Sequence, residues 1–219
     1  MFLGHYAVAL GAKKAAPATS LGTFILAAQL VDLLWPVFLL LGWERVRVDP
    51  GNTAVTPLAF VSYPWTHSLV ATAAWGIALG LAYWLVRRYP RGAVVVGLLV
   101  ISHWVLDALV HAPDLPVTPG GETRVGLGLW DSLPATLVLE LGLFAAGAWI
   151  YSRATEAVDR TGAWSFRALI AVLALIYAGN LFGGAPPGET EVAVVTLGLW
   201  LFVPWGYWID RHRRARVTA

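Results

Sequence analysis

Six long runs of mostly apolar residues divide the chain, and each is close to the roughly 20 residues that a helix needs to cross a bilayer. Helix-breaking segments separate the runs, among them Asp49-Pro50-Gly51-Asn52 and the Gly/Pro-rich stretch from Gly183 to Gly188. No connection is long enough to divide two domains. The pattern predicts one all-α domain over residues 1–219, a polytopic membrane helical bundle whose six transmembrane helices are Thr19–Trp43, Pro64–Val86, Gly92–His111, Leu133–Tyr151, Trp164–Phe182 and Val192–Ile209.

The composition agrees with this pattern. Hydrophobic residues make up 58% of the 219 residues and charged residues only 13%, whereas soluble proteins carry roughly 25% charged residues. A single core of this size could not bury so many apolar side chains, so lipid must solvate much of the surface. The chain has no Cys, which excludes disulfides, thiolate metal sites and Cys nucleophiles.

The first residues form a shorter apolar segment. Phe2 to Ala12 is too short to span a bilayer, and Lys13 and Lys14 follow it, whereas a signal peptide carries its positive charges in front. We expect a half-helix or interfacial helix whose C-terminal end is held at the cytoplasmic surface by the two lysines. His5 would then point into the membrane.

Basic residues concentrate in alternate connections. Three of the connections hold only Arg45, Arg47 and Arg124. By the positive-inside rule, this asymmetry predicts a plasma (inner) membrane protein with both termini in the cytoplasm. Twelve of the 15 basic residues lie on the predicted cytoplasmic side: Lys13, Lys14, Arg87, Arg88, Arg91, Arg153, Arg160, Arg167, Arg211, Arg213, Arg214 and Arg216.

Several ionisable residues interrupt the apolar spans. Such groups are costly inside a bilayer and usually serve a function. A rise of 1.5 Å per residue puts all of them in the outer half of the membrane, with Asp32, for example, roughly 20 Å from the cytoplasmic end of its span. They belong to residues 1–145, while 164–209 supplies two apolar helices. The residues are Asp32, His67, His103, Asp107, His111 and Glu140.

The third predicted span carries the clearest pattern. His103, Asp107 and His111 follow one another at intervals of four residues, which places them on one helix face. Imidazole nitrogen and carboxylate oxygen are the donors of divalent metal sites, and a set without Cys suits Zn²⁺, Mn²⁺ or Fe²⁺. Asp32 and His67 are the natural completions of such a site.

Other interpretations remain open for the same residues. Asp32 and Glu140 could accept hydrogen bonds that join helices, and His103 with Asp107 could form a proton relay. Because all these groups lie at one depth, their combination favours a metal site.

Two flanking segments complete the picture. The long connection from Pro116 to Trp130, bounded by Asp114 and Asp131, is a candidate lid over the site. The basic tail at residues 211–216 favours contact with anionic membrane lipids and is too short a patch for nucleic-acid binding.

The polar motifs resemble those of the membrane-bound metal-dependent hydrolase family often called YdjM-like. That family has an early His, a Pro-Asp-x-Asp-His run, a Thr-His-Ser and a His-x-x-x-Asp helix. This chain has Gly4-His5, Ala28-Gln29-Leu30-Val31-Asp32, Thr66-His67-Ser68, and His103 with Asp107, all within its first half.

The resemblance implies that His5, Asp32, His67, His103 and Asp107 are metal ligands. The chain departs from the family at Asp32-Leu33-Leu34-Trp35, where a second carboxylate and a His are missing. The alternatives are compensation by His111, Asp114 or Glu140, a single metal ion, or none.

These observations lead to a functional hypothesis. We expect an integral-membrane, metal-dependent hydrolase that acts on an amphiphilic, lipid-like phosphoester or ester. Glu140 would serve as general base or as a partner of a ligand, and His111 would orient a ligand or donate a proton to the leaving group. The alternatives are a transporter with a proton or ion path and a non-catalytic subunit of a membrane complex.

Overall fold

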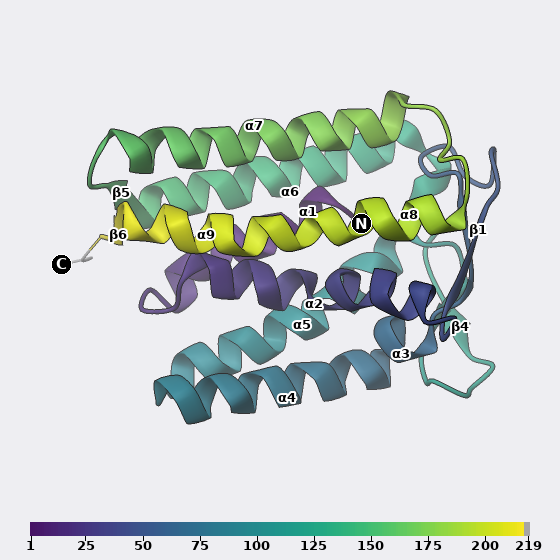
Figure 1. The fold of residues 1–219 in the computed structure, drawn as a ribbon, viewed down its shortest axis with the longest axis horizontal. Helices are drawn as coiled ribbons and strands as arrows, with labels where there is room; N and C mark the ends of the chain where they lie inside the picture. The colour runs from purple at the N-terminus through teal and green to yellow at the C-terminus, as the bar shows by residue number, and fades with distance from the viewer. Residues whose placement is uncertain (217–219) are drawn as a thin grey trace.

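The computed structural model describes residues 1–216 and confirms a multi-pass, all-α membrane bundle (Figure 1). Six helical segments are long and apolar enough to cross a bilayer, and they run along the long axis of the molecule. The helices are α1 (Leu3–Ala15), α2 (Leu21–Leu40), α3 (Pro64–His67), α4 (Leu69–Arg87), α5 (Pro90–Val110), α6 (Leu133–Ala154), α7 (Arg160–Phe182), α8 (Glu189–Thr196) and α9 (Phe202–Arg211).

The second predicted span is broken near its start. Ser68 has an extended backbone and separates the single turn of α3 from α4. Its hydroxyl donates to the carbonyl oxygen of Pro64 and accepts from the backbone N–H of Ala71, so it caps α4 while holding the preceding turn. The break leaves His67 on a short turn of its own.

The last predicted span is continuous in direction but not uniformly α-helical. A 3₁₀ turn at Leu197–Leu201 joins α8 to α9. Pro204 follows this turn, and it lacks the backbone N–H that an α-helix would pair with the carbonyl of Trp200. The missing hydrogen bond accounts for a local departure from α-helical geometry.

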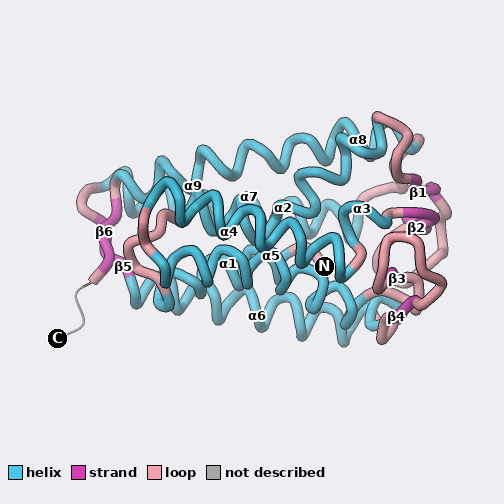
Figure 2. The backbone as a smooth tube through the Cα atoms, turned by 90° about the horizontal axis from the view of Figure 1, so that it is seen from below, coloured by secondary structure: helices cyan, strands magenta, loops and turns pink. Residues whose placement is uncertain are grey.

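Helix α1 lies inside the bundle, packed against α2, α5 and α6. The N-terminus is therefore located within the length of the bundle and not at one end (Figures 1 and 2). Leu3, Ala9 and Leu10 have no more than 1% of their surface exposed. The half-helix is present as expected, and it is a core element of the bundle.

Lys13 is buried near the end of α1 and is paired with protein. Its Nζ donates to the carbonyl oxygen of Thr19 at 2.9 Å and to Oδ2 of Asp210 at 2.8 Å. Asp210 also accepts from the backbone N–H of Leu21 and the hydroxyl of Tyr151. The pair of Lys13 and Asp210 thus joins four helices, α1, α2, α6 and α9, while Lys14 is exposed.

Short antiparallel strand pairs cover the two ends of the bundle (Figure 2). Strands β1 (Arg45–Val48) and β2 (Leu58–Ser62) pair at one end, where β3 (Leu115–Pro116) and β4 (Arg124–Val125) also pair. At the other end β5 (Thr155–Ala157) pairs with β6 (Arg213–Ala215). The first two pairs border the polar site described next.

Candidate metal centre

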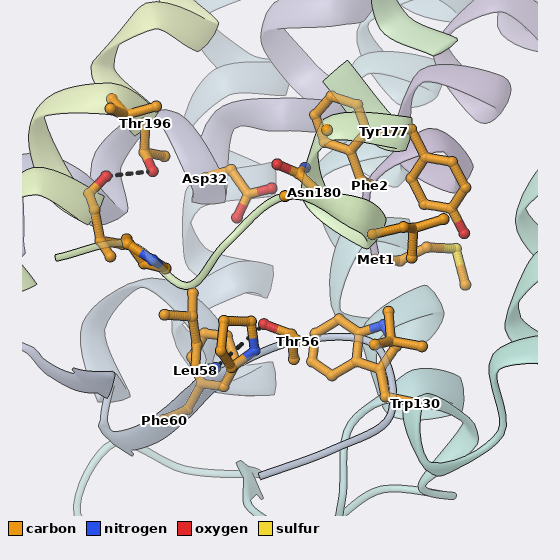
Figure 3. Close-up of a pocket in the computed structure, with 18 of the residues that line it drawn as sticks. Met1, Phe2, Asp32, Thr56, Leu58, Phe60, Trp130, Tyr177, Asn180 and Thr196 are labelled. Carbon is orange, nitrogen blue, oxygen red and sulfur yellow. Dashed lines mark hydrogen bonds between the residues drawn. The ribbon is translucent and has the colours of Figure 1, made fainter. Parts of the chain in front are cut away.

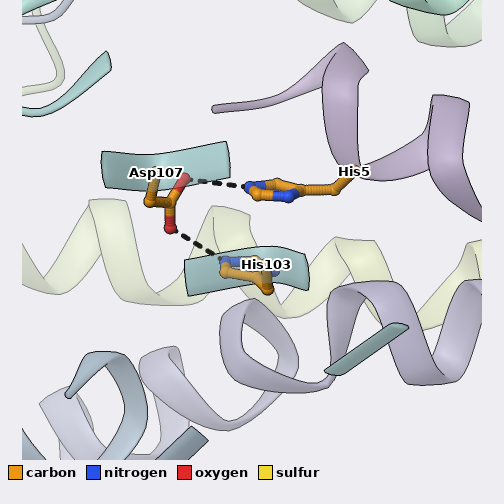
Figure 4. A group of neighbouring side chains, drawn as sticks. All are labelled: His5, His103 and Asp107. Atoms are coloured by element: carbon orange, nitrogen blue, oxygen red, sulfur yellow. Dashed lines mark hydrogen bonds and ion pairs between the residues drawn. The ribbon is translucent and has the colours of Figure 1, made fainter. Parts of the chain in front are cut away.

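Five predicted ligands from four helices converge on one buried point. His5 comes from α1, Asp32 from α2, His67 from α3, and His103 and Asp107 from α5. They form two overlapping groups in which the donor atoms lie within 4.8 Å of one another. One group is His5, His103 and Asp107 (Figure 4), and the other is Asp32, His67 and His103.

The two carboxylates lie between the three imidazole rings. Asp107 has Oδ1 3.1 Å from Nε2 of His5, and Oδ2 3.2 Å from Nε2 of His103. Asp32 has Oδ1 3.4 Å from Nε2 of His67 and 3.6 Å from Nε2 of His103. Each ring therefore directs its Nε2 towards a carboxylate.

The hydrogen bonding of His103 indicates which kind of group this site can hold. Its Nδ1 lies 2.8 Å from the carbonyl oxygen of Ala28, which can only accept, so Nδ1 carries a hydrogen. Its Nε2 is buried and makes no hydrogen bond within residues 1–216, although two carboxylates face it. In a neutral ring this Nε2 is a lone pair opposed to anionic oxygens, an arrangement that a shared cation or an added proton would stabilise.

The charge balance of the site also calls for a cation. Asp32, Asp107 and Glu140 contribute three carboxylates, and none of the described residues that line the adjoining cavity is Lys or Arg. The ammonium group of Met1 lies 2.5 Å from Oδ1 of Asp107. Buried carboxylates need paired positive charge, so the nitrogen and oxygen donors fit a divalent ion.

Glu140 lies beside the ligand groups but in neither of them. Its Oε2 accepts from the backbone N–H groups of Phe2, Leu3 and Gly4, at 3.0, 2.6 and 3.3 Å. These are the unpaired donors at the start of α1, where a negative charge is favourable. Glu140 therefore anchors the helix that carries His5, and it also lines the cavity.

His111 lies just beyond the helical face on which it was predicted. Helix α5 ends at Val110, and His111 has an extended backbone. Its Nδ1 lies 3.0 Å from Oδ1 of Asp114, which also accepts from the hydroxyl of Tyr63. The ring lines the cavity and is in neither ligand group.

A cavity of about 500 Å³ adjoins the site. The carboxylate of Asp32 points into it, and its walls carry the rings of Phe60, Trp130 and Tyr177 (Figure 3). The side chain of Asp32 is 21% exposed, against 4% or less for the other four candidate ligands. Asp32 is therefore the ligand most open to a molecule in the cavity.

The segments that cover the cavity are not those of the expected lid. Of the connection from Pro116 to Trp130, only Trp130 is among the lining residues. The connection between β1 and β2 contributes Val55, Thr56 and Pro57, and the segment after α7 contributes Gly183, Gly184, Pro186 and Pro187.

The sequence did not single out one further residue near the site, Glu44. Glu44, 2% exposed, accepts hydrogen bonds from the backbone N–H groups of Trp65 and Thr66 and from the hydroxyl of Thr66. In the sequence it is an acidic residue in a connection next to Arg45, which is typical of a solvated loop. Only the folded chain brings it beneath the turn that carries His67.

No family model, curated protein or solved structure matches the chain.

Proposed function

We propose that the protein is an integral-membrane, metal-dependent hydrolase of the YdjM-like kind, acting on an amphiphilic phosphoester or ester. The observation that carries the proposal is the Nε2 of His103, which is buried between the carboxylates of Asp32 and Asp107 and makes no hydrogen bond within residues 1–216. His5 and His67 complete the donor set.

The imidazole and carboxylate side chains would have different roles in holding the ion. The three imidazoles offer neutral nitrogens, and Asp32 and Asp107 balance the charge of a divalent cation such as Zn²⁺, Mn²⁺ or Fe²⁺. When bound, the ion supplies Lewis acidity towards a phosphoryl or acyl oxygen and makes water more acidic.

Glu140 and His111 are the candidates for proton transfer. The hydrogen bonds to Glu140 within residues 1–216 all involve Oε2, which leaves Oε1 to accept a proton at the cavity. The Nδ1 of His111 faces the carboxylate of Asp114, so its Nε2 is the nitrogen available to a leaving group.

The cavity favours a substrate with a polar head and an apolar body. Its polar lining includes candidate ligands and proton-transfer groups, and Trp35, Val192 and Val195 add apolar surface to the lining. Most of the lining helical residues belong to segments of membrane-spanning length, and such a site suits a lipid-like molecule.

Metal analysis of detergent-purified protein by mass spectrometry tests the proposal. We expect near-stoichiometric Zn, Mn or Fe in the wild type and loss of this metal in His103→Ala and Asp107→Ala. His212→Ala is the matched control, because His212 pairs with Asp159 near the opposite end of the bundle. A wild type without metal, even after reconstitution, would overturn the hydrolase proposal in favour of a proton relay or a structural cluster.

We further propose that both termini face the cytoplasm of the plasma membrane, as the basic connections favour. The chain has no Cys, so single substitutions report orientation cleanly. An impermeant thiol reagent added outside intact cells should label Asn52→Cys and leave Arg214→Cys unlabelled. Both positions are exposed, and the reverse pattern would contradict the orientation.

A further inference from the structure

His67 is positioned by the short turn that carries it. Helix α3 contains only residues Pro64–His67, too few for a helix to be stable without support. Glu44 supplies that support, since its Oε1 accepts from the backbone N–H groups of Trp65 and Thr66 at 2.8 Å each. The carboxylate is buried, so these contacts are protected from water.

The second carboxylate oxygen of Glu44 extends this series of hydrogen bonds towards the metal centre. Oε2 of Glu44 accepts from the hydroxyl of Thr66 at 2.7 Å. The same hydroxyl oxygen lies 2.7 Å from Nδ1 of His67. The side chains of Glu44, Thr66 and His67 are all buried, which favours well-defined hydrogen bonds.

The direction of these hydrogen bonds follows from counting hydrogens. A threonine hydroxyl has one hydrogen, which Thr66 donates to Glu44. Its contact with His67 must then be one in which Nδ1 carries a hydrogen and donates. The neutral ring consequently has its lone pair at Nε2, which lies 3.4 Å from Asp32 and 3.9 Å from Asp107.

We propose that Glu44 is a positioning residue that acts through the hydroxyl of Thr66 to hold His67 with its Nε2 lone pair directed into the metal centre. The inference rests on the proposed metal-dependent function and deepens it. Partners of this kind commonly change metal affinity 10- to 100-fold when removed.

Glu44→Gln tests the direction of the hydrogen bonds with little change in shape. The amide oxygen must face the two backbone N–H groups, so the amide NH₂ must face the hydroxyl of Thr66. Thr66 would then accept from Gln and donate to Nδ1 of His67, which moves the ring hydrogen to Nε2 and blocks the ligand atom.

Metal affinity supplies the first readout. We expect Glu44→Gln and Thr66→Val to weaken Zn²⁺ binding by about 10- to 100-fold in competition with a chelator, and Thr66→Ser to bind like the wild type. Glu122→Gln is the control, because Glu122 is an exposed acid in the connection between β3 and β4. Wild-type affinity in Glu44→Gln or Thr66→Val would overturn the positioning role and leave the metal centre standing.

The tautomer of His67 supplies a readout that needs no metal. In ¹⁵N NMR spectra of metal-free protein at alkaline pH, the wild type should carry the His67 hydrogen on Nδ1, and Glu44→Gln should carry it on Nε2. An unchanged tautomer would overturn the inference. If the wild type binds no metal, the proposed function fails, whereas the tautomer still decides the role of Glu44.

A substitution of Thr66 tests the same inference if Glu44→Gln does not fold. Thr66→Val retains the backbone contacts to Glu44 and removes only the hydroxyl. A lower Zn²⁺ affinity in Thr66→Val together with wild-type affinity in Thr66→Ser supports the inference. Equal affinity in the two variants overturns it.

Discussion

The imidazole ring of His5 stacks on that of His103, with ring centroids 3.6 Å apart and planes inclined by 5° (Figure 4). Two charged rings would repel each other in this arrangement, so at least one ring is neutral and offers a lone pair. The contact joins residues 98 positions apart and depends on where α1 lies inside the bundle.

Gly147 of α6 controls how deeply α1 can pack. A Cβ atom at this position would overlap the backbone of Ala7, including its carbonyl oxygen, so α1 would have to move. We expect Gly147→Ala to lower the free energy of unfolding by about 1–3 kcal/mol, as overpacking generally does. Because α1 carries His5, metal affinity should fall as well.

Gly142 provides the matched control on the same helix. A Cβ there would meet no atom within 4 Å, so Gly142→Ala should leave stability and affinity near the wild type. Thermal unfolding in detergent and a Zn²⁺ titration check both variants. Equal behaviour of the two alanines would show that the α1–α6 contact does not determine the site.

Glu140 has two roles that different substitutions can separate. Glu140→Gln retains an oxygen for the N–H groups of Phe2, Leu3 and Gly4 but removes the proton acceptor, so folding should persist while turnover falls. Glu140→Leu leaves those donors unpaired and should cost about 1–3 kcal/mol of stability.

The measurements for Glu140 are thermal unfolding and hydrolysis of a lipid phosphoester or ester. Full turnover in Glu140→Gln would contradict a base role and leave only the anchoring of α1.

Substitution of His111 should lower turnover without changing the metal content. It lines the cavity but belongs to neither ligand group. We expect His111→Ala to keep the wild-type metal stoichiometry and to lose roughly 10²- to 10⁴-fold in kcat, the usual contribution of general acid–base catalysis.

Metal analysis and steady-state kinetics of His111→Ala test this. Loss of metal in the variant would instead place His111 among the ligands.

The pair Lys13 and Asp210 should be a stability element remote from the site. Their side chains are 7% and 13% exposed, and breaking a buried ion pair by removing one partner costs about 3–5 kcal/mol. We therefore expect Lys13→Met to lower the unfolding temperature markedly while metal binding persists in the folded fraction.

An exposed pair serves as the reference for Lys13. Arg47 and Asp49 are 63% and 43% exposed, and such pairs contribute at most about 1 kcal/mol. Arg47→Met should therefore unfold close to the wild type. A similar small effect in Lys13→Met would mean that water reaches Asp210.

The apolar runs alone were sufficient to predict six membrane helices, because the length and hydropathy needed to cross a bilayer are local properties of the chain. The interval between His103 and Asp107 likewise predicted a shared helix face, since the helical repeat is set by the backbone. Termini of elements were less predictable, as the break at Ser68 depends on side-chain hydrogen bonds.

The tertiary structure decided which residues meet. From the sequence, His5 could reach the other ligands only if α1 lay deep in the bundle, and packing against α2, α5 and α6 places it there. The sequence equally could not show that Glu44 reaches Thr66, or that Glu140 anchors α1. These contacts join residues distant along the chain, and helix packing and buried hydrogen bonds, not local propensity, determine them.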